Sequence, residues 1–194
     1  MPDGGRVVAG SARGTRLEQP PEGTRPLTDR VKESLFAALE ASGALTGPFL
    51  DLFAGSGAAG IEALSRGAPS ATFVERDGHA CSVIGNNLRK TRMASAGHVI
   101  RADVPSFLQG GSSATREPFR AALVDPPYGE PVLLEALNLL AESERRWLEP
   151  GASVVAKHFW RDEMPAQVGG LEMTRSRRFG ETTLTFYTRA EEGR

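Results

Sequence analysis

The stretch LVDPPYGE, residues 123–130, places an acidic residue, two prolines and an aromatic ring directly after an apolar run. Each proline fixes its own φ at about −65° and disfavours a helical conformation in the residue before it, so we expect Asp125 and Pro126 to be extended. Because proline has no N–H, the carbonyls of Asp125 and Pro126 and the Asp125 carboxylate form a set of acceptors. The exocyclic amino group of a nucleobase suits these acceptors, and Tyr128 offers a stacking face worth roughly 1–3 kcal/mol. Taken alone, the stretch is also consistent with a rigid turn at the end of a strand.

A glycine-rich stretch, FLDLFAGSGAAGIEAL (residues 49–64), runs from a predicted buried strand into a predicted helix. Its glycines Gly55, Gly57 and Gly60 satisfy the G-x-G-x-x-G pattern, and Glu75 follows the first of them by about 20 residues. Glycines at such a corner let a ligand approach the backbone, and an acidic residue at the end of the next strand can accept hydrogen bonds from ribose hydroxyls. Both a nicotinamide dinucleotide and S-adenosylmethionine fit this geometry.

Two further acidic residues bear on the choice between these ligands. Asp51 precedes the loop, and a carboxylate that faces the glycine corner suits a cation and repels a pyrophosphate. S-adenosylmethionine carries an ammonium and a sulfonium group, so Asp51 favours it. Asp103 ends the next predicted strand, where it could accept from the adenine amino group or cap the following helix, and the sequence favours neither role.

Together, the two stretches indicate transfer of a methyl group to the amino nitrogen of a base. Such a nitrogen is a poor nucleophile because its lone pair is delocalised into the ring. Acceptors that hold its hydrogens favour a pyramidal nitrogen and stabilise the charge that develops on attack. A sulfonium methyl is already activated, so catalysis would consist mostly of aligning nitrogen, carbon and sulfur. Asp125 is a candidate acceptor for the released proton.

The elements that must position these residues alternate between strand and helix, which predicts an α/β fold with a mostly parallel sheet covered by helices on both faces. Helices are expected over residues 28–43, 58–67, 79–91, 103–111 and 132–148, and strands over residues 48–53, 71–75, 98–102, 121–125 and 152–158. Thr28 is the expected N-cap of the first helix. Two final strand-like runs, residues 171–179 and 182–188, predict a terminal antiparallel hairpin.

Composition predicts one main domain, over residues 28–190, preceded by a small β-hairpin arm over residues 1–27 that is weakly anchored to it. No apolar run approaches the ~20 residues of a membrane helix, and the single cysteine, Cys81, cannot form an internal disulfide. We therefore expect a cytoplasmic protein that does not bind membranes. The three histidines and Cys81 show no metal-ligand spacing, so no metal is expected.

Both stretches, together with RVVAGSARGTRL, GTRPLTDRVKESLF and LEALSRGA, make the chain similar to a known family over nearly its whole length. It resembles the bacterial Rossmann-like, S-adenosylmethionine-dependent methyltransferases that modify the guanine amino group N2 in 16S ribosomal RNA. The resemblance implies a seven-stranded sheet, an S-adenosylmethionine cofactor and, as partner, 16S rRNA within a small-subunit ribosomal particle. It also implies a monomer.

The resemblance also implies roles for individual residues. Asp51, Gly55, Ser56 and Gly57 would contact the methionine part of the cofactor, Glu75 the ribose and Asp103 the adenine. The full set of implied cofactor-binding residues is Asp51, Phe53, Ala54, Gly55, Ser56, Gly57, Gly60, Glu75, Arg76, Ala102 and Asp103. The target guanine would meet Asp125, Pro126, Pro127 and Tyr128. The arginines that suit RNA phosphates are Arg6, Arg13, Arg16, Arg25 and Arg30.

Several alternatives stay open at this point. A DNA amino methyltransferase, acting on adenine N6 or cytosine N4, shares both motifs but normally needs a larger target-recognition region than this arm. An NAD-dependent oxidoreductase would use the glycine loop alone, and a non-catalytic RNA-binding module is a third alternative. Arg175, Arg177 and Arg178 could extend an RNA-binding patch or protect an exposed strand edge, and the sequence does not separate these roles.

Overall fold

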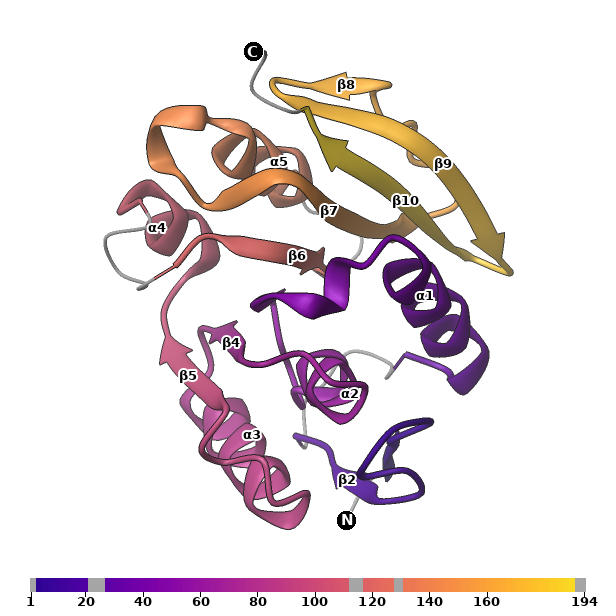
Figure 1. Cartoon of the computed structure of the whole chain (residues 1–194), viewed down its shortest axis with the longest axis vertical. Helices are drawn as coiled ribbons and strands as arrows, with labels where there is room; N and C mark the ends of the chain where they lie inside the picture. Colours follow the sequence, from indigo (N-terminus) through magenta and orange to yellow (C-terminus); the bar gives the residue numbers. More distant parts are fainter. Residues whose placement is uncertain (1–2, 21–26, 112–116, 128–130, 191–194) are drawn as a thin grey trace.

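The computed structural model describes residues 3–20, 27–111, 117–127 and 131–190, which fold around one eight-stranded sheet (Figure 1). The strand order is β5-β4-β3-β6-β7-β10-β9-β8. Five neighbouring strands are parallel: β3 (Phe49–Leu52), β4 (Ala71–Glu75), β5 (Gly97–Arg101), β6 (Phe119–Val124) and β7 (Leu148–Phe159). The other three continue the sheet in antiparallel pairing: β8 (Gln167–Val168), β9 (Leu171–Phe179) and β10 (Thr182–Arg189).

The predicted α/β fold with a mostly parallel sheet and a terminal hairpin is confirmed. The strand count differs from the expected seven, because β8 adds an eighth strand of two residues that pair with Leu171 and Glu172. A two-residue strand is too short to show the alternation of apolar and polar residues by which strands are recognised.

Helices cover both faces of the sheet (Figure 1). One face carries α1 (Asp29–Ala41), α2 (Ala58–Ser65) and α3 (Gly78–Lys90), and the other carries α4 (Val104–Gln109) and α5 (Val132–Ala141). Successive residues of β3 divide between the two cores, since Phe49 packs with the first group of helices and Leu50 with the second. Thr28 caps α1 as predicted, with its Oγ1 accepting a hydrogen bond from the Val31 N–H at 3.4 Å.

Helix α5 is shorter than the sequence predicts, because it ends at Ala141 and not at residue 148. The 3-10 turn η3 (Ser143–Arg145) follows, and Arg146 then adopts a left-handed conformation with φ 54°. This reversal carries Trp147 into the core, where its side chain is fully buried and its Nε1–H donates to the carbonyl of Leu108 at 2.9 Å. If α5 continued as a helix to residue 148, Trp147 would lose this buried position.

The N-terminal arm is a two-stranded antiparallel sheet of β1 (Asp3–Arg6) and β2 (Arg16–Glu18), lying beside α2 and α3 (Figure 1). The sequence predicted weak anchoring, and the structure shows the opposite. Val7, Ala12 and Leu17 are buried in the same core as α1 and α2, so the arm is part of the packed structure. After the arm and α1, the 3-10 turn η1 (Ala44–Thr46) leads into β3.

Buried polar groups fix the arm to the helices. The fully buried carboxylate of Glu62, on α2, accepts from the Val8 N–H at 2.8 Å and the Ala9 N–H at 3.0 Å, and it pairs with Arg66 at 2.8 Å. On α3, the fully buried Asn87 accepts from the Glu18 N–H at 2.8 Å. Its amide nitrogen donates to the carbonyls of Glu18 and Ser56, both at 2.9 Å. No helix in the described part of the chain is both long and apolar enough to cross a bilayer.

Replacing Glu62 with alanine should detach the arm and destabilise the protein. The change leaves two partly buried N–H groups and the Nε–H of Arg66 without their acceptor, so the free energy of unfolding should fall by about 3 kcal/mol. Urea denaturation measures this loss, and limited proteolysis should show early cleavage in the arm. Glu40→Ala is the matched control because exposed Glu40 pairs with the same Arg66, and it should cost less than about 1 kcal/mol. Equal losses for the two variants would contradict the anchoring role of Glu62.

Candidate active site

Three acidic residues meet at the edge of the sheet where β3, β4 and β6 end. Leu52 of β3 pairs with Val74 of β4 and with Val124 of β6. Asp51 precedes Leu52, while Glu75 and Asp125 each follow the partner residue by one position. The structure thus brings together the acidic residues that the sequence singled out in two separate motifs. Their charges interact, because Asp125 and Glu75 both act to raise the pKa of Asp51.

The glycine loop connects β3 to α2 at this edge. Three of its residues have left-handed backbones, with φ 61° at Phe53, 56° at Gly55 and 75° at Gly57. Gly60 meets a different requirement, because a Cβ there would lie 2.3 Å from Cε1 of Phe73. Gly60 therefore permits close packing of α2 on the sheet, while Gly55 and Gly57 shape the turn.

Glu75 holds the loop in place. One of its carboxylate oxygens, Oε2, accepts from the Gly55 N–H, and the other, Oε1, accepts from the Asp77 N–H, both at 2.9 Å. The carboxylate is half-buried, so its position at the end of β4 is set by backbone donors on two sides. This placement matches the sequence-based expectation of an acidic residue beside the glycine corner.

Asp51 is nearly fully buried, and its Oδ2 accepts from the Gly60 N–H at 2.8 Å. Burial raises the pKa of Asp51 to about 8, against the lowering effect of that hydrogen bond. Without a cation beside it, the Asp51 carboxyl is thus largely protonated at pH 7. A positive charge placed nearby would favour the ionised form, which is a property suited to binding a cationic ligand.

Asp103 caps α4 through its Oδ2, which accepts from the backbone N–H of Ser106 at 3.2 Å and from its hydroxyl at 3.0 Å. Of the two roles that the sequence left open, the structure therefore shows the capping role. Ala102 lies beside Glu75, with its N–H donating to the Glu75 carbonyl at 3.1 Å, and Arg76 is exposed next to them. Ser56 and Ala54 lie within the loop, between Phe53 and Gly57.

The DPP corner carries a partner that sequence reasoning missed. Lys157, on β7, places its Nζ 2.5 Å from Oδ1 of Asp125. This pairing follows from strand order, because β7 lies beside β6 and Ala156 pairs with Val124. Burial raises the pKa of Asp125 and Lys157 opposes that rise. A lysine inside the otherwise apolar run SVVAK is the signal that could have identified it.

The rest of this corner is only partly described. Pro126 is buried and Pro127 is half-buried. The Asp125 N–H donates to the Leu52 carbonyl at 3.3 Å, so pairing with β3 continues one residue beyond β6. Tyr128, the expected stacking residue, lies outside the described residues. Among the residues that the structure does describe, no group of three or more His, Cys, Asp or Glu side chains could hold a metal ion.

The predicted RNA-binding arginines that the structure describes lie on the arm and at the start of α1. Arg13 and Arg16 are exposed on the arm. Arg6 pairs with Asp29 at 2.8 Å, at the start of α1. Arg30 lies over the ring of Phe179 in the C-terminal hairpin, 6.0 Å from the centroid. Arg25 lies outside the described residues.

The glycine loop, the edge carboxylates and the DPP corner on a doubly covered α/β sheet define a Rossmann-like methyltransferase. The chain belongs to the family described as Conserved hypothetical protein 95, whose model matches residues 5–188. The resemblance noted from the sequence is therefore confirmed at the level of the family.

Individual relatives agree with this assignment. The chain is 40% identical to the Bacillus subtilis protein YlbH over 190 residues, which cover 94% of this chain and 97% of YlbH. It is 34% identical to the Ribosomal RNA small subunit methyltransferase D of Escherichia coli, over 97% of this chain and 91% of the relative. An RNA methyltransferase from Salinibacter ruber, solved in complex with S-adenosyl-L-homocysteine, shares the fold with a TM-score of 0.64. At 18% identity, that match covers 88% of this chain and 97% of the other.

The raised pKa of Asp51 predicts a pH-dependent stability. Because the folded chain keeps a proton that the unfolded chain releases above pH 3.8, the stabilising contribution of this proton is lost as the pH rises toward about 8. Relative to Asp51→Asn, the wild-type free energy of unfolding should fall by up to about 1.4 kcal/mol per pH unit. Urea denaturation at pH 5 and pH 8 measures the difference.

The control for this experiment is Asp77→Asn. Asp77 is exposed, and the backbone N–H groups of His79 and Ala80 lower its pKa, so its titration is complete below pH 5. Its difference from wild type should therefore stay constant between the two pH values. If the free energies of unfolding of wild type and Asp51→Asn change equally between pH 5 and pH 8, Asp51 is ionised in the folded protein at both pH values. That result would contradict the prediction.

Proposed function

We propose that this protein transfers the methyl group of S-adenosylmethionine to the exocyclic amino group, N2, of a guanine in 16S ribosomal RNA. The observation that carries the proposal is the convergence of Asp51, Glu75 and Asp125 at one sheet edge, beside the glycine loop. The relatives' names supply the class of substrate, because the Escherichia coli relative is called a small-subunit ribosomal RNA methyltransferase. The proposal places the enzyme in the cytoplasm, as a monomer acting on a small-subunit ribosomal particle.

The carboxylates favour a cationic ligand over a dinucleotide. A pyrophosphate at the glycine corner would approach three acidic side chains, of which one pairs with a lysine. An ammonium or sulfonium group would instead gain from all three. On this proposal Glu75 accepts from ribose hydroxyls, and the loop residues Gly55 to Gly57 adjoin the methionine part. Within the described residues, both hydrogen bonds that Asp103 accepts at the start of α4 go to Oδ2, so Oδ1 can accept from the adenine amino group while Asp103 caps α4.

When bound, S-adenosylmethionine supplies a methyl group that is already activated as part of a sulfonium. Asp125 and the Pro126 carbonyl accept hydrogen bonds from the guanine amino group and stabilise the positive charge that grows on its nitrogen. Burial, by raising the pKa of Asp125, also makes this carboxylate a better acceptor for the proton that the nitrogen must lose. Lys157 positions the Asp125 carboxylate and favours its ionised form.

The proposal assigns the two parts of the chain different tasks. Residues 28–190 form the catalytic domain, and residues 1–27 form an arm whose arginines contact RNA phosphates. The arm is small for sequence-specific recognition of duplex DNA, which argues against a DNA amino methyltransferase acting on adenine N6 or cytosine N4. A ribosomal particle, by contrast, presents its target in a fixed shape, so the enzyme need only match that shape.

The direct test incubates the purified protein and labelled S-adenosylmethionine with small ribosomal subunits, naked 16S rRNA or duplex DNA. Mass analysis of the nucleosides should detect N2-methylguanosine in the ribosomal substrates and no methylated base in the DNA. In a parallel binding measurement, S-adenosylhomocysteine should bind more tightly than NAD. Tighter binding of NAD, or methylated adenine or cytosine as the product, would contradict the proposal.

Two variants separate chemistry from binding. Asp125→Asn should lower turnover about 100-fold or more, because it removes the negative charge that faces the reacting nitrogen. Its affinity for S-adenosylhomocysteine should remain near wild type. Lys157→Met should move the acid limb of the turnover–pH profile to higher pH, since loss of the ammonium group lets burial raise the pKa of Asp125 further.

Glu135→Gln, an exposed change on α5, is the matched control and should alter neither turnover nor the pH profile. Thermal unfolding of each variant checks that the fold is retained. If Asp125→Asn keeps wild-type turnover, the assigned role of Asp125 is wrong. An unshifted acid limb in Lys157→Met would limit Lys157 to a structural role.

A further inference from the structure

Five exposed arginines gather around the C-terminal hairpin, and each lies over an aromatic ring. We call this set the hairpin arginines; its members are Arg30, Arg161, Arg175, Arg177 and Arg178. Two of them flank one ring, since the guanidinium carbon of Arg178 lies 3.8 Å and that of Arg161 lies 4.9 Å from the Trp160 centroid. Stacking holds a guanidinium group in place while its N–H donors stay available at the edges.

The other three hairpin arginines use two further rings. Arg175 lies 4.3 Å from the centroid of Phe186. Arg177 lies 5.3 Å from the centroid of Phe179, and Arg30, on α1, lies 6.0 Å from the same ring.

Because successive residues of β9 point to opposite faces, Arg175 and Arg177 lie on the face that α1 covers, and Arg178 lies on the other face, against Trp160. Positive charge is therefore present on both faces at the end of the hairpin. The ordered guanidinium groups of the hairpin arginines are unlike those of a merely solvated set of arginines.

No carboxylate in the described part of the chain forms an ion pair with a hairpin arginine. Acidic residues do lie nearby in sequence: Asp162 accepts from the Phe159 N–H, and Glu181 follows the hairpin turn. Two of the hairpin arginines donate hydrogen bonds to neutral acceptors. Arg177 donates to the Ser34 hydroxyl at 3.0 Å, and Arg178 donates to the Gly180 carbonyl at 2.7 Å. The positive charge of the hairpin arginines is therefore not neutralised by pairing.

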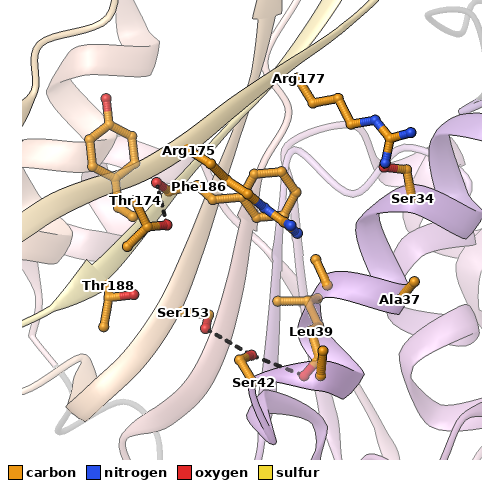
Figure 2. Close-up of a pocket in the computed structure, with 13 residues that line it drawn as sticks. Ser34, Ala37, Leu39, Ser42, Ser153, Thr174, Arg175, Arg177, Phe186 and Thr188 are labelled. Carbon is orange, nitrogen blue, oxygen red and sulfur yellow. Dashed lines mark hydrogen bonds between the residues drawn. The ribbon is translucent and has the colours of Figure 1, made fainter.

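A groove of about 470 Å³ lies between α1 and the hairpin, with Arg175 and Arg177 on its hairpin side (Figure 2). Hydroxyl groups line part of it, contributed by Ser34, Ser42, Ser153, Thr174 and Thr188, and apolar residues of α1 together with Phe186 line the rest. Its lining contains no acidic residue. Figure 2 shows Arg177 reaching toward Ser34 across the groove, and Ser153 hydrogen-bonded to Ser42 at its base. Hydroxyls and guanidinium groups are the donors that proteins use for phosphate and sugar oxygens.

The hairpin arginines lie close to the proposed catalytic residues. Lys157 of β7 pairs with Leu184 of β10, which in turn pairs with Arg177 of β9. Arg177 is therefore two strand spacings, about 10 Å, from the lysine that holds Asp125. Trp160 follows three residues after Lys157, at the same end of β7. A nucleic acid that places a base at Asp125 would extend over this region within one or two nucleotides.

Protection of an exposed edge explains the arginines less fully. Strand β8 pairs only with Leu171 and Glu172, so the remainder of β9 does form an edge that charge can protect. Edge protection needs charge alone, and lysines without ring contacts would serve it. It explains neither the stacking on three rings nor the hydroxyl-lined groove beside Arg175 and Arg177.

We infer that the hairpin arginines and the groove between α1 and β9 bind the sugar–phosphate backbone of the RNA that flanks the target base. The inference rests on the proposed function, and it adds a second RNA contact on the side of the catalytic edge away from the N-terminal arm. Arginine side chains and serine or threonine hydroxyls are groups that contact phosphates. RNA-binding residues from both ends of the chain then flank α1.

The test measures RNA affinity without requiring turnover. The full chain carrying Arg177→Gln and Arg178→Gln is titrated against a labelled single-stranded RNA, naked 16S rRNA and small ribosomal subunits over a range of salt concentrations. Affinity should fall about tenfold, and the slope of log K against log salt should shrink by about 1 to 2, as expected for one or two lost phosphate contacts. Affinity for S-adenosylhomocysteine should not change. In the methylation assay the KM for RNA should rise with kcat nearly unchanged.

The control removes two charges elsewhere. Arg89→Gln with Lys90→Gln, exposed at the end of α3 near the opposite edge of the sheet, should leave affinity and salt slope near wild type. Equal losses in the two double variants, or no loss in either, would overturn the inference. A loss confined to ribosomal subunits, with naked RNA bound normally, would also overturn it by identifying a protein partner.

The proposed function and this inference fail in different ways. If wild type binds RNA through the hairpin arginines but yields no N2-methylguanosine, the surface is supported and the proposed function is wrong. If wild type yields N2-methylguanosine and the double variant keeps the wild-type KM, the function is supported and the surface is wrong.

Discussion

Mutual repulsion among three carboxylates at one sheet edge is the constraint on which the site depends. Each is accommodated by a different device. The carboxyl of Asp51 is buried against the Gly60 N–H and retains a proton, since its pKa is raised to about 8. Glu75 accepts from two backbone N–H groups, and Asp125 pairs with Lys157. These three devices reduce the repulsion at the edge. Asp51 keeps a proton, Asp125 has a lysine beside it, and Glu75 has two backbone donors. A cationic ligand would therefore meet acidic side chains that already have hydrogen-bond or ion-pair partners within the protein.

The fold places the proposed RNA contacts on either side of this edge. The arm joins the core through Glu62 and Asn87, and the C-terminal hairpin extends the sheet past β7. Helix α1 lies between them, with Arg6 paired to Asp29 at its start and Arg30 over the hairpin's Phe179. Figure 1 shows the arm and the hairpin on opposite sides of α1. A small methyltransferase can thus present an extended surface without a separate recognition domain.

The sequence predicted those features that depend on local pattern. Strand β4 was predicted with the bounds that the structure shows, because four buried residues precede Glu75 and turn residues lie on both sides. Thr28 was identified as a cap because capping needs only residues three positions apart. The glycine loop and the DPP corner were recognisable because backbone geometry is encoded in glycine and proline themselves.

Features that depend on distant contacts were not predictable in this way. The end of α5 is decided by Trp147, whose hydrogen-bond partner, Leu108, lies 39 residues earlier in the chain. The Asp125–Lys157 pair requires the knowledge that β6 and β7 are neighbours. Anchoring of the arm depends on Glu62, a helical residue that by sequence alone reads as an ordinary surface acid. In each case the missing information was which elements pack together.

Asn87 gives the arm a direct mechanical connection to the glycine loop. One side-chain amide holds the backbone of Glu18 in β2 and the carbonyl of Ser56 in the loop. A displacement of the arm must either move Asn87 or break its hydrogen bond to the Ser56 carbonyl. If a ligand at the loop and a partner at the arm each favour this arrangement, linkage requires the two effects to be equal, so a filled loop would stabilise the position of the arm as much as a held arm would preorganise the loop.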